Sequence, residues 1–366
     1  MRRISVFVCI AVLGFGGVLM RRRVQGPALP RAEAAIDTRQ PTAGSDEKAQ
    51  NREQLAQVTE VKAIPLNDTL LGNVADVKLD DRGWFYFNAQ YPSASPGKGR
   101  IIRLNPTSQQ YDEINPGLPG GKQVPESSVL QSYDVDRSGN IYLAMAKPEA
   151  VLIQDARGVA HSEIDLGDFL PGLISADADG NVWVGGRVLL SRNPITVGGT
   201  EIRVYNRLGK LLNVPAISLD KDDLRMARFA HSRGRSSLIA GARIYDFRRH
   251  DLAAAREYPF KISQISPLSL TGRRPLSQNH RLILGLSYMG KDLISYGVLP
   301  DEKGKLGGEG FVTLISPSGE ALTSELLIPK EYGSPVAAER DGSLYCLGKR
   351  AGQMVLTKIK VRDLDR

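Results

Sequence analysis

The phrase Asp136-Arg137-Ser138-Gly139-Asn140-Ile141-Tyr142-Leu143 recurs along this chain of 366 residues. Each copy has an acidic residue, two further residues, a glycine and then a run of aromatic and aliphatic residues. The other copies occupy residues 80–87, 177–184 and 339–346. Self-similarity at an interval of several tens of residues is typical of propellers, solenoids and repeat arrays.

The acidic-x-x-Gly part of the phrase predicts a turn between two strands. Aspartate accepts local backbone hydrogen bonds and glycine allows a positive φ, while the Trp, Tyr, Phe, Ile and Val residues that follow favour a strand. A second hairpin follows in most repeats, at residues 151–158, 202–209 and 312–319. Each unit should therefore hold about four antiparallel strands, which is the size of a propeller blade.

The spacing of the turn glycines predicts the number of blades. Successive glycines, with Gly234 in a weaker copy, are separated by 56, 41 and 54 residues, and Gly342 follows after another 108. Since 108 is twice 54, one degenerate blade is expected in that interval, with a strand at residues 281–288. We therefore predict an all-β, six-bladed β-propeller, with seven shorter blades as the alternative.

The last blade lacks one strand at the C-terminus. Only residues 343–347 and 354–361 can form strands after Gly342, whereas residues 58–66 precede the first repeat and have the composition of a strand. The N-terminal strand of the domain is thus expected to complete the last blade, which leaves no free radial edge. The propeller domain is predicted over residues 58–366.

The N-terminus has the features of a signal anchor or signal peptide over residues 1–23. Arg2 and Arg3 precede seventeen uncharged residues, 4–20. As a helix this stretch would be roughly 26 Å long at 1.5 Å per residue, the short end of what spans a hydrocarbon core. Arginines and prolines follow before any small-residue cleavage site, which favours an uncleaved anchor.

Localisation follows from this segment. Basic residues flank it almost equally, so the positive-inside rule leaves the orientation open. We expect the propeller outside the cytoplasm, in the periplasm, anchored to the membrane by residues 4–20. If Met20 were the true start, the anchor would be absent.

Residues 24–57 are predicted to form a disordered linker, because they are rich in Ala, Gln, Pro and charge and contain almost no aromatic or β-branched run. Residues 1–57 carry nine basic and five acidic residues, and so account for half of the net charge of +8. The rest of the chain is only mildly basic, with no basic face interleaved with aromatic residues. Nucleic acid is therefore not an expected partner.

The paired patterns D-x-x-G-x-[IV]-[YW] and [VI]-x-x-[YF]-[DN]-x-x-G resemble those of NHL-repeat and related six-bladed propeller proteins over residues 58–366. The resemblance implies the propeller fold. It also implies several kinds of function: protein- or polysaccharide-binding modules, sensor domains, and metal-dependent lactonases or lyases. The lactonase-like enzymes hold a divalent cation with Glu, Asn and Asp side chains over the central channel, and no residue of this chain can be matched to that set.

The sequence contains no recognisable catalytic or metal motif. Asp177-x-Asp179-Gly180 lacks the spaced ligands of a calcium loop and is interpreted as a turn. Cys346, in a predicted strand, is expected to be a small buried hydrophobe. The histidines show no metal-ligand spacing and are expected on the surface or in turns, with His231 in the turn position that Asp holds elsewhere: His161, His231, His250 and His280. No resident cofactor is expected.

Candidate ligand-binding residues come from the innermost strand of each blade, which runs beside the propeller axis. Polar side chains there can line the central funnel or pair across it. Counting back from the turn glycines gives five of them: Asp76, Lys78, Asp134, Ser175 and Arg228. The segments 187–199 and 300–310 are interpreted as long loops that cover a face of the propeller.

These features predict a monomeric, membrane-tethered or exported binding or scaffolding module for a protein or for a polar small-molecule or saccharide ligand. The alternative is a metal-dependent hydrolase or lyase. In that case Asp76 and Asp134 would hold a divalent cation that polarises a substrate carbonyl or activates water.

Overall fold

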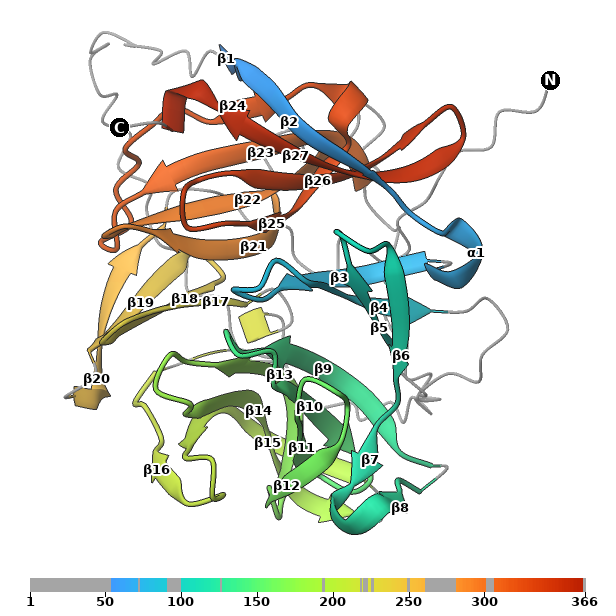
Figure 1. The fold of residues 1–366 in the computed structure, drawn as a ribbon. Helices are drawn as coiled ribbons and strands as arrows, with labels where there is room; N and C mark the ends of the chain where they lie inside the picture. The colour runs from blue at the N-terminus through green and yellow to red at the C-terminus, as the bar shows by residue number, and fades with distance from the viewer. Residues whose placement is uncertain are drawn as a thin grey trace, which may run out of the picture. The chain divides into compact units, whose positions relative to one another are not determined.

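Six antiparallel sheets follow one another along the chain in the computed structural model (Figure 1). The structure describes residues 54–71, 73–90, 100–125, 127–192, 195–217, 219, 223–224, 227–248, 251–260, 281–300 and 306–364. Each sheet contains four strands in antiparallel order, and one carries an additional strand at its edge. The predicted all-β, six-bladed propeller is confirmed.

The blades consist of consecutive strands, with the first-named strand innermost. The first blade consists of β3 (Asn73–Leu79), β4 (Phe85–Gln90), β5 (Arg100–Asn105) and β6 (Gln110–Ile114). The second consists of β9 (Val129–Val135), β10 (Ile141–Ala146), β11 (Ala150–Gln154) and β12 (Ala160–Asp165). The third consists of β13 (Phe169–Ala176), β14 (Val182–Arg192), β15 (Ile195–Tyr205) and β16 (Leu211–Asn213). The fourth blade consists of β17 (Arg228–Ser232), β18 (Arg235–Ala240), β19 (Arg243–Arg248) and β20 (Asp251–Pro259). The fifth consists of β21 (Leu282–Met289), β22 (Asp292–Pro300), β23 (Leu306–Ile315) and β24 (Leu326–Ile328). The sixth contains β25 (Ser334–Ala338), β26 (Leu344–Arg350) and β27 (Gln353–Val361). The short elements between them are α1 (Asp68–Leu71), β7 (Gly117–Leu118), β8 (Lys122–Gln123), and the 3-10 turns η1 (Pro119–Gly121), η2 (Lys330–Tyr332) and η3 (Arg362–Leu364).

The N-terminal strand closes the ring, as predicted. Strand β2 (Val58–Pro65) pairs antiparallel with β27 and becomes the outermost strand of the sixth blade (Figure 1). The two ends are also joined by side chains, since Arg350 donates two hydrogen bonds to the Glu60 carboxylate at 3.0 and 2.7 Å. The sixth blade is therefore built from both ends of the domain.

Residues 54–56 also belong to the propeller rather than to the linker predicted over residues 24–57. Strand β1 (Gln54–Leu55) pairs parallel with β24, and the Ala56 amide donates to the Leu327 carbonyl at 2.8 Å. Ala56 is buried among apolar residues of the fifth and sixth blades, which the alanine-rich composition did not reveal. Residues 24–53 of the predicted linker and the predicted anchor lie outside the described residues.

The repeated phrase forms the tight turn that was predicted. One carboxylate oxygen of Asp136 accepts hydrogen bonds from the amides of Ser138 and Asn140 at 2.9 Å, and Gly139 has a φ of +82°. The other carboxylate oxygen accepts a bond from the aromatic side chain six residues later. This acid–aromatic pair recurs in four blades: Asp80–Tyr86, Asp136–Tyr142, Asp177–Trp183 and Glu339–Tyr345.

The core lies between blades. Six apolar clusters each combine side chains of two neighbouring blades. Because strand residues alternate between faces, Phe85 and Phe87 of β4 point toward the sixth blade while Tyr86 points toward the second. Middle strands such as β10 and β11 are buried on both faces, which explains the nearly continuous apolar runs of the sequence.

The segment 187–199 is not the loop that was predicted. Strands β14 and β15 continue to pair through Arg192 and Ile195, so this segment extends the hairpin of the third blade. The register shifts between Arg187 and Leu189 and again between Leu189 and Ser191. In the segment 300–310, strand β23 begins at Leu306, and residues 301–305 lie outside the described part.

Candidate functional site

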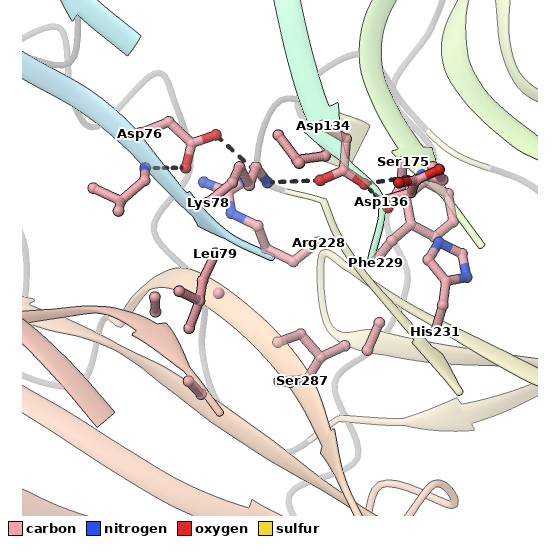
Figure 2. Close-up of a pocket in the computed structure, with 18 of the residues that line it drawn as sticks. Asp76, Lys78, Leu79, Asp134, Asp136, Ser175, Arg228, Phe229, His231 and Ser287 are labelled. Atoms are coloured by element: carbon pink, nitrogen blue, oxygen red, sulfur yellow. Dashed lines mark hydrogen bonds and ion pairs between the residues drawn. The ribbon is translucent and has the colours of Figure 1, made fainter. Parts of the chain in front are cut away.

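A central cavity of about 220 Å³ is lined by all six innermost strands. This volume lies below the roughly 300–1,000 Å³ of pockets for drug-sized ligands, so it suits a small molecule. All five predicted funnel residues line it: Asp76 and Lys78 on β3, Asp134 on β9, Ser175 on β13 and Arg228 on β17. Figure 2 shows their side chains converging from separate blades.

Lys78 lies between two carboxylates of the cavity. Its Nζ is 3.5 Å from Oδ2 of Asp76 and 3.7 Å from Oδ1 of Asp134, so one ammonium interacts with the first and second blades (Figure 2). Burial lowers the pKa of Lys78, but the two carboxylates outweigh this effect and the net pKa is raised. The ammonium group is therefore charged at neutral pH.

Asp134 links the second blade to the third. Its Oδ2 accepts hydrogen bonds from the Ser175 hydroxyl at 2.8 Å and from the Ala176 amide at 2.9 Å. Asp76 has fewer partners, since its Oδ1 accepts only the amide of Val77, at 2.9 Å. Its side chain is also more exposed than that of Asp134, at 40% against 13%. Asp76 therefore has lone pairs available to a ligand.

Arg228 makes its hydrogen bonds to neutral carbonyls. Nε donates to Leu284 O at 3.0 Å and Nη1 donates to Ala227 O at 2.7 Å. Within the described residues it forms no ion pair. Burial lowers the pKa of Arg228 and Asp76 partly offsets this, but a guanidinium stays charged at neutral pH. A positive charge thus lines the cavity without a carboxylate in direct contact.

Tyr296 also lines the cavity, although sequence analysis did not find it. It lies on β22, the second strand of its blade, and faces Gly285 of β21 across the pair. A Cβ at Gly285 would lie 2.1 Å from Cζ and Oη of Tyr296, so the missing side chain makes room for the phenol. No hydrogen bond to the Tyr296 hydroxyl occurs within the described residues.

His231 was expected in a turn, and that prediction is wrong. Strand β17 continues through Ser232, and His231 pairs with Ser236 of β18, so its ring lines the cavity. Nδ1 lies 2.7 Å from the Ser236 hydroxyl, and Nε2 is buried without a partner in the described part of the chain. Burial lowers the pKa of His231 below its ordinary value.

Asp136 and Asp177 border the cavity but are not available to a ligand. Each carboxylate accepts two backbone amides, an asparagine side chain and the aromatic residue of its own turn. Asp177-x-Asp179-Gly180 is accordingly the turn that was predicted. These two residues shape the rim of the cavity through the local repeat.

The cavity fits a divalent cation poorly. Among the described residues, no group of three His, Cys, Asp or Glu side chains could hold a metal ion. Of the described carboxylates that line the cavity, only Asp76 and Asp134 cap no turn, and the ammonium of Lys78 lies between them. A cation bound by these two acids would have to displace Lys78.

Two further residue-level predictions can be compared with the structure. Cys346 is buried in β26 without a disulfide, and burial raises the pKa of its thiol to about 12. It is the small buried hydrophobe that was predicted. In the described part of the chain, no helix is long and apolar enough to cross a membrane, and the predicted anchor at residues 4–20 lies outside that part.

Comparison with solved structures finds other β-propellers. A member of the DUF4221 family from Bacteroides vulgatus matches with a TM-score of 0.50 at 11% identity, covering 85% of this chain and 99% of that one. The likeness is one of fold. Virginiamycin B lyase from Staphylococcus aureus matches with a TM-score of 0.47 at 13% identity, covering 79% of this chain and 82% of the lyase.

A calcium-binding protein, regucalcin, from Agrobacterium tumefaciens matches with a TM-score of 0.46 at 14% identity, covering 83% of this chain and 96% of that one. No protein-family model and no curated protein sequence matches the chain. The predicted resemblance to NHL-like propellers is confirmed at the level of the fold by the six four-stranded blades of the structure, and the function has to be argued from the cavity itself.

Proposed function

We propose that this propeller is a binding module whose central cavity holds a small polar ligand. One observation carries the proposal: the six innermost strands bring two carboxylates, an ammonium, a guanidinium and several hydroxyls to one cavity of about 220 Å³. Pockets with a few convergent polar groups on a rigid scaffold are the usual form of a small-molecule site.

The scaffold holds these groups in place before a ligand arrives. Each innermost strand is hydrogen-bonded within its blade and contributes apolar side chains to the clusters between blades. Asp134 is further fixed by Ser175 and Ala176, and Arg228 is fixed by two carbonyls. Groups that are already ordered lose little conformational freedom on binding, which favours affinity for a small ligand.

The position of Lys78 supports a binding function rather than that of a metal-dependent hydrolase or lyase. Such an enzyme needs a cation that polarises the substrate or activates water. In this cavity the ammonium of Lys78 already neutralises the two acids that would hold it. Elemental analysis of the purified full chain tests this choice, because about one divalent ion per chain after dialysis would support the hydrolase instead.

The proposed location of the module is extracytoplasmic. Residues 4–20 carry no charge and follow two arginines, which favours insertion into a membrane. We propose that they tether the propeller and present its cavity to the periplasm. Fusion of a periplasm-dependent reporter enzyme to the C-terminus should give activity, and an inactive but expressed fusion would contradict this location.

The binding proposal is tested with polar small molecules from several classes: monosaccharides, amino acids and hydroxy acids. We expect at least one class to raise the thermal unfolding midpoint of the wild type and to lose that effect in Asp134→Asn. Asp112→Asn is the matched control, since Asp112 pairs with Arg103 on the outer strands of the first blade. Stabilisation that survives in Asp134→Asn would locate the ligand elsewhere and contradict the proposal.

A further inference from the structure

Besides Arg137 and the two aspartates of the turns, four charged groups line the cavity, and they are not equivalent. Asp76, Lys78 and Asp134 form a chain of opposite charges with distances of 3.5 and 3.7 Å. Arg228 has no part in that chain, because its two hydrogen bonds go to the carbonyls of Leu284 and Ala227. Its charge is solvated only by neutral groups of the described protein.

The two carbonyls also orient the guanidinium. With Nε and one hydrogen of Nη1 engaged, the remaining donors of the Arg228 guanidinium are left for another acceptor. Figure 2 shows the side chain extending from β17 toward Asp76 and Lys78. An arginine held in one orientation presents adjacent N–H groups in the geometry that matches a carboxylate.

The Tyr296 hydroxyl supplies a further donor beside Arg228. Tyr296 pairs with Gly285, the residue that follows Leu284, whose carbonyl accepts the Arg228 Nε hydrogen bond, and both Tyr296 and Arg228 line the cavity. Burial is the main reason that the pKa of Tyr296 is raised, so the hydroxyl keeps its proton at neutral pH. A protonated phenol can donate a hydrogen bond to an anion in the cavity.

From these contacts we infer that the ligand carries a carboxylate that binds Arg228 and Tyr296, next to a hydroxyl or ammonium group that donates to Asp76. This inference rests on the proposed binding function and specifies its ligand class. A carboxylate gives Arg228 an anionic partner, which it does not have among the described residues. The neighbouring donor uses the free lone pairs of Asp76, whose side chain is 40% exposed, and keeps Asp76 from repelling the carboxylate.

The probes are three small molecules that separate these contacts: glycolate has a carboxylate and a hydroxyl, acetate has only the carboxylate, and ethylene glycol has only hydroxyls. Binding to the full-length protein is measured by saturation-transfer NMR and by the thermal unfolding midpoint, at constant ionic strength. We expect affinity to fall in the order glycolate, acetate, ethylene glycol, with ethylene glycol undetectable at 100-fold the glycolate dissociation constant.

Variants then assign each contact. Arg228→Gln should weaken glycolate and acetate about 10- to 100-fold, the usual worth of a charge-assisted pair. Tyr296→Phe should weaken both about 3- to 10-fold. Asp76→Asn should remove the advantage of glycolate over acetate. Arg350→Gln is the matched control, because Arg350 pairs with Glu60 away from the cavity, and it should leave both affinities unchanged.

Tyr296→Phe keeps the aromatic ring in its apolar cluster, so it remains informative if Arg228→Gln fails to fold. The carboxylate inference would be overturned if glycolate and ethylene glycol bound equally well. It would also be overturned if glycolate binding were unchanged in both Arg228→Gln and Tyr296→Phe. The binding module itself would survive that result if Asp134→Asn still abolished binding. No response of the wild type to 100 mM glycolate would also overturn the inference.

Discussion

At the scale of single residues, the acidic residue of the repeat has two structural roles: it caps the turn and it pairs with a buried aromatic side chain. One carboxylate oxygen of Asp136 caps the turn by accepting two amides, and the other accepts the hydroxyl of Tyr142 at 3.1 Å. The turn is thereby fixed to the buried face of the next strand. Spacing of six residues between acid and aromatic is the constraint that the repeat preserves in four blades.

Asp136→Ala should therefore destabilise the protein more than an ordinary turn substitution. It removes the carboxylate that accepts hydrogen bonds from two backbone amides and leaves the buried Tyr142 hydroxyl unpaired, at a cost of roughly 2–4 kcal/mol in the free energy of unfolding. Asp155→Ala is the matched control, because Asp155 caps the same kind of turn with exposed partners and no aromatic. Its cost should stay within about 1 kcal/mol, measured by urea unfolding. Equal costs would show that the aromatic pair contributes nothing.

The buried imidazole of His231 makes stability depend on pH. Burial lowers its pKa in the folded state, whereas the unfolded chain has the ordinary value near 6.5. Below about pH 6.5 the unfolded state binds the additional proton, so stability falls as the pH is lowered from 7 to 5, by at most about 1.4 kcal/mol per pH unit. Above pH 7 both states are neutral and the effect vanishes.

Urea unfolding of the wild type and of His231→Phe between pH 5 and 8 measures this dependence. The variant should lose most of the slope below pH 6.5, while substitution of the exposed His161 by Gln should keep it. A slope that persists in His231→Phe would assign the effect to other groups.

The residues of the cavity show what local sequence can predict. Asp76, Lys78, Asp134, Ser175 and Arg228 were found because each lies five to seven residues before a turn glycine, on an innermost strand. Tyr296 was missed because it reaches the cavity from the second strand, through the space left by Gly285. His231 was misplaced because the motif position of aspartate is occupied there by a residue inside the strand. These two facts depend on pairing between strands, which no local pattern contains.

At the scale of strands and blades, the sequence pattern predicted which strands and blades exist better than it predicted where each strand begins and ends. The degenerate fifth blade and the N-terminal closing strand were both found, because strand composition and turn spacing are local properties. The extension of the hairpin β14–β15 and the parallel strand β1 were not. Both rest on pairing that short polar segments make only against a partner already in place.

Closure by β2 can be tested with two neighbouring side chains of the same strand. Ile64 is buried, at 2% exposure, between the sixth and first blades, whereas Val61 is 50% exposed. Ile64→Ala should cost roughly 2–4 kcal/mol in the free energy of unfolding, and Val61→Ala about 0.5 kcal/mol or less. Similar small costs for both variants would mean that β2 contributes little to the fold.

At the scale of the whole molecule, polar and charged groups in the cavity join neighbouring blades close to the axis. Lys78 and Asp76 belong to the first blade, Asp134 to the second and Ser175 to the third. The link is short-range and partly shielded from water. The propeller therefore has a polar connection at its centre in addition to the apolar layers between blades.

The variant Lys78→Met should show how much this polar connection contributes to the free energy of unfolding. Without the ammonium, Asp76 and Asp134 repel each other, and we expect a loss of about 1–2 kcal/mol, reduced from the value for a fully buried pair because Lys78 is 31% exposed. Adding Asp134→Asn should recover part of the loss, since one of the two negative charges is removed. Urea unfolding of the wild type, both single variants and the double variant measures the coupling. Strict additivity would show that the three groups act independently.

The closing strand also sets an order of events during synthesis. Glu60 and Arg350 are 290 residues apart in sequence yet hydrogen-bonded in the sixth blade. A ribosome must therefore produce nearly the whole domain before β2 can meet its partner, and until then the ends of the ring stay unpaired. Contacts between such distant segments form slowly and favour late, cooperative completion of a fold. A chain released without its final strand would hold five blades and an open seam.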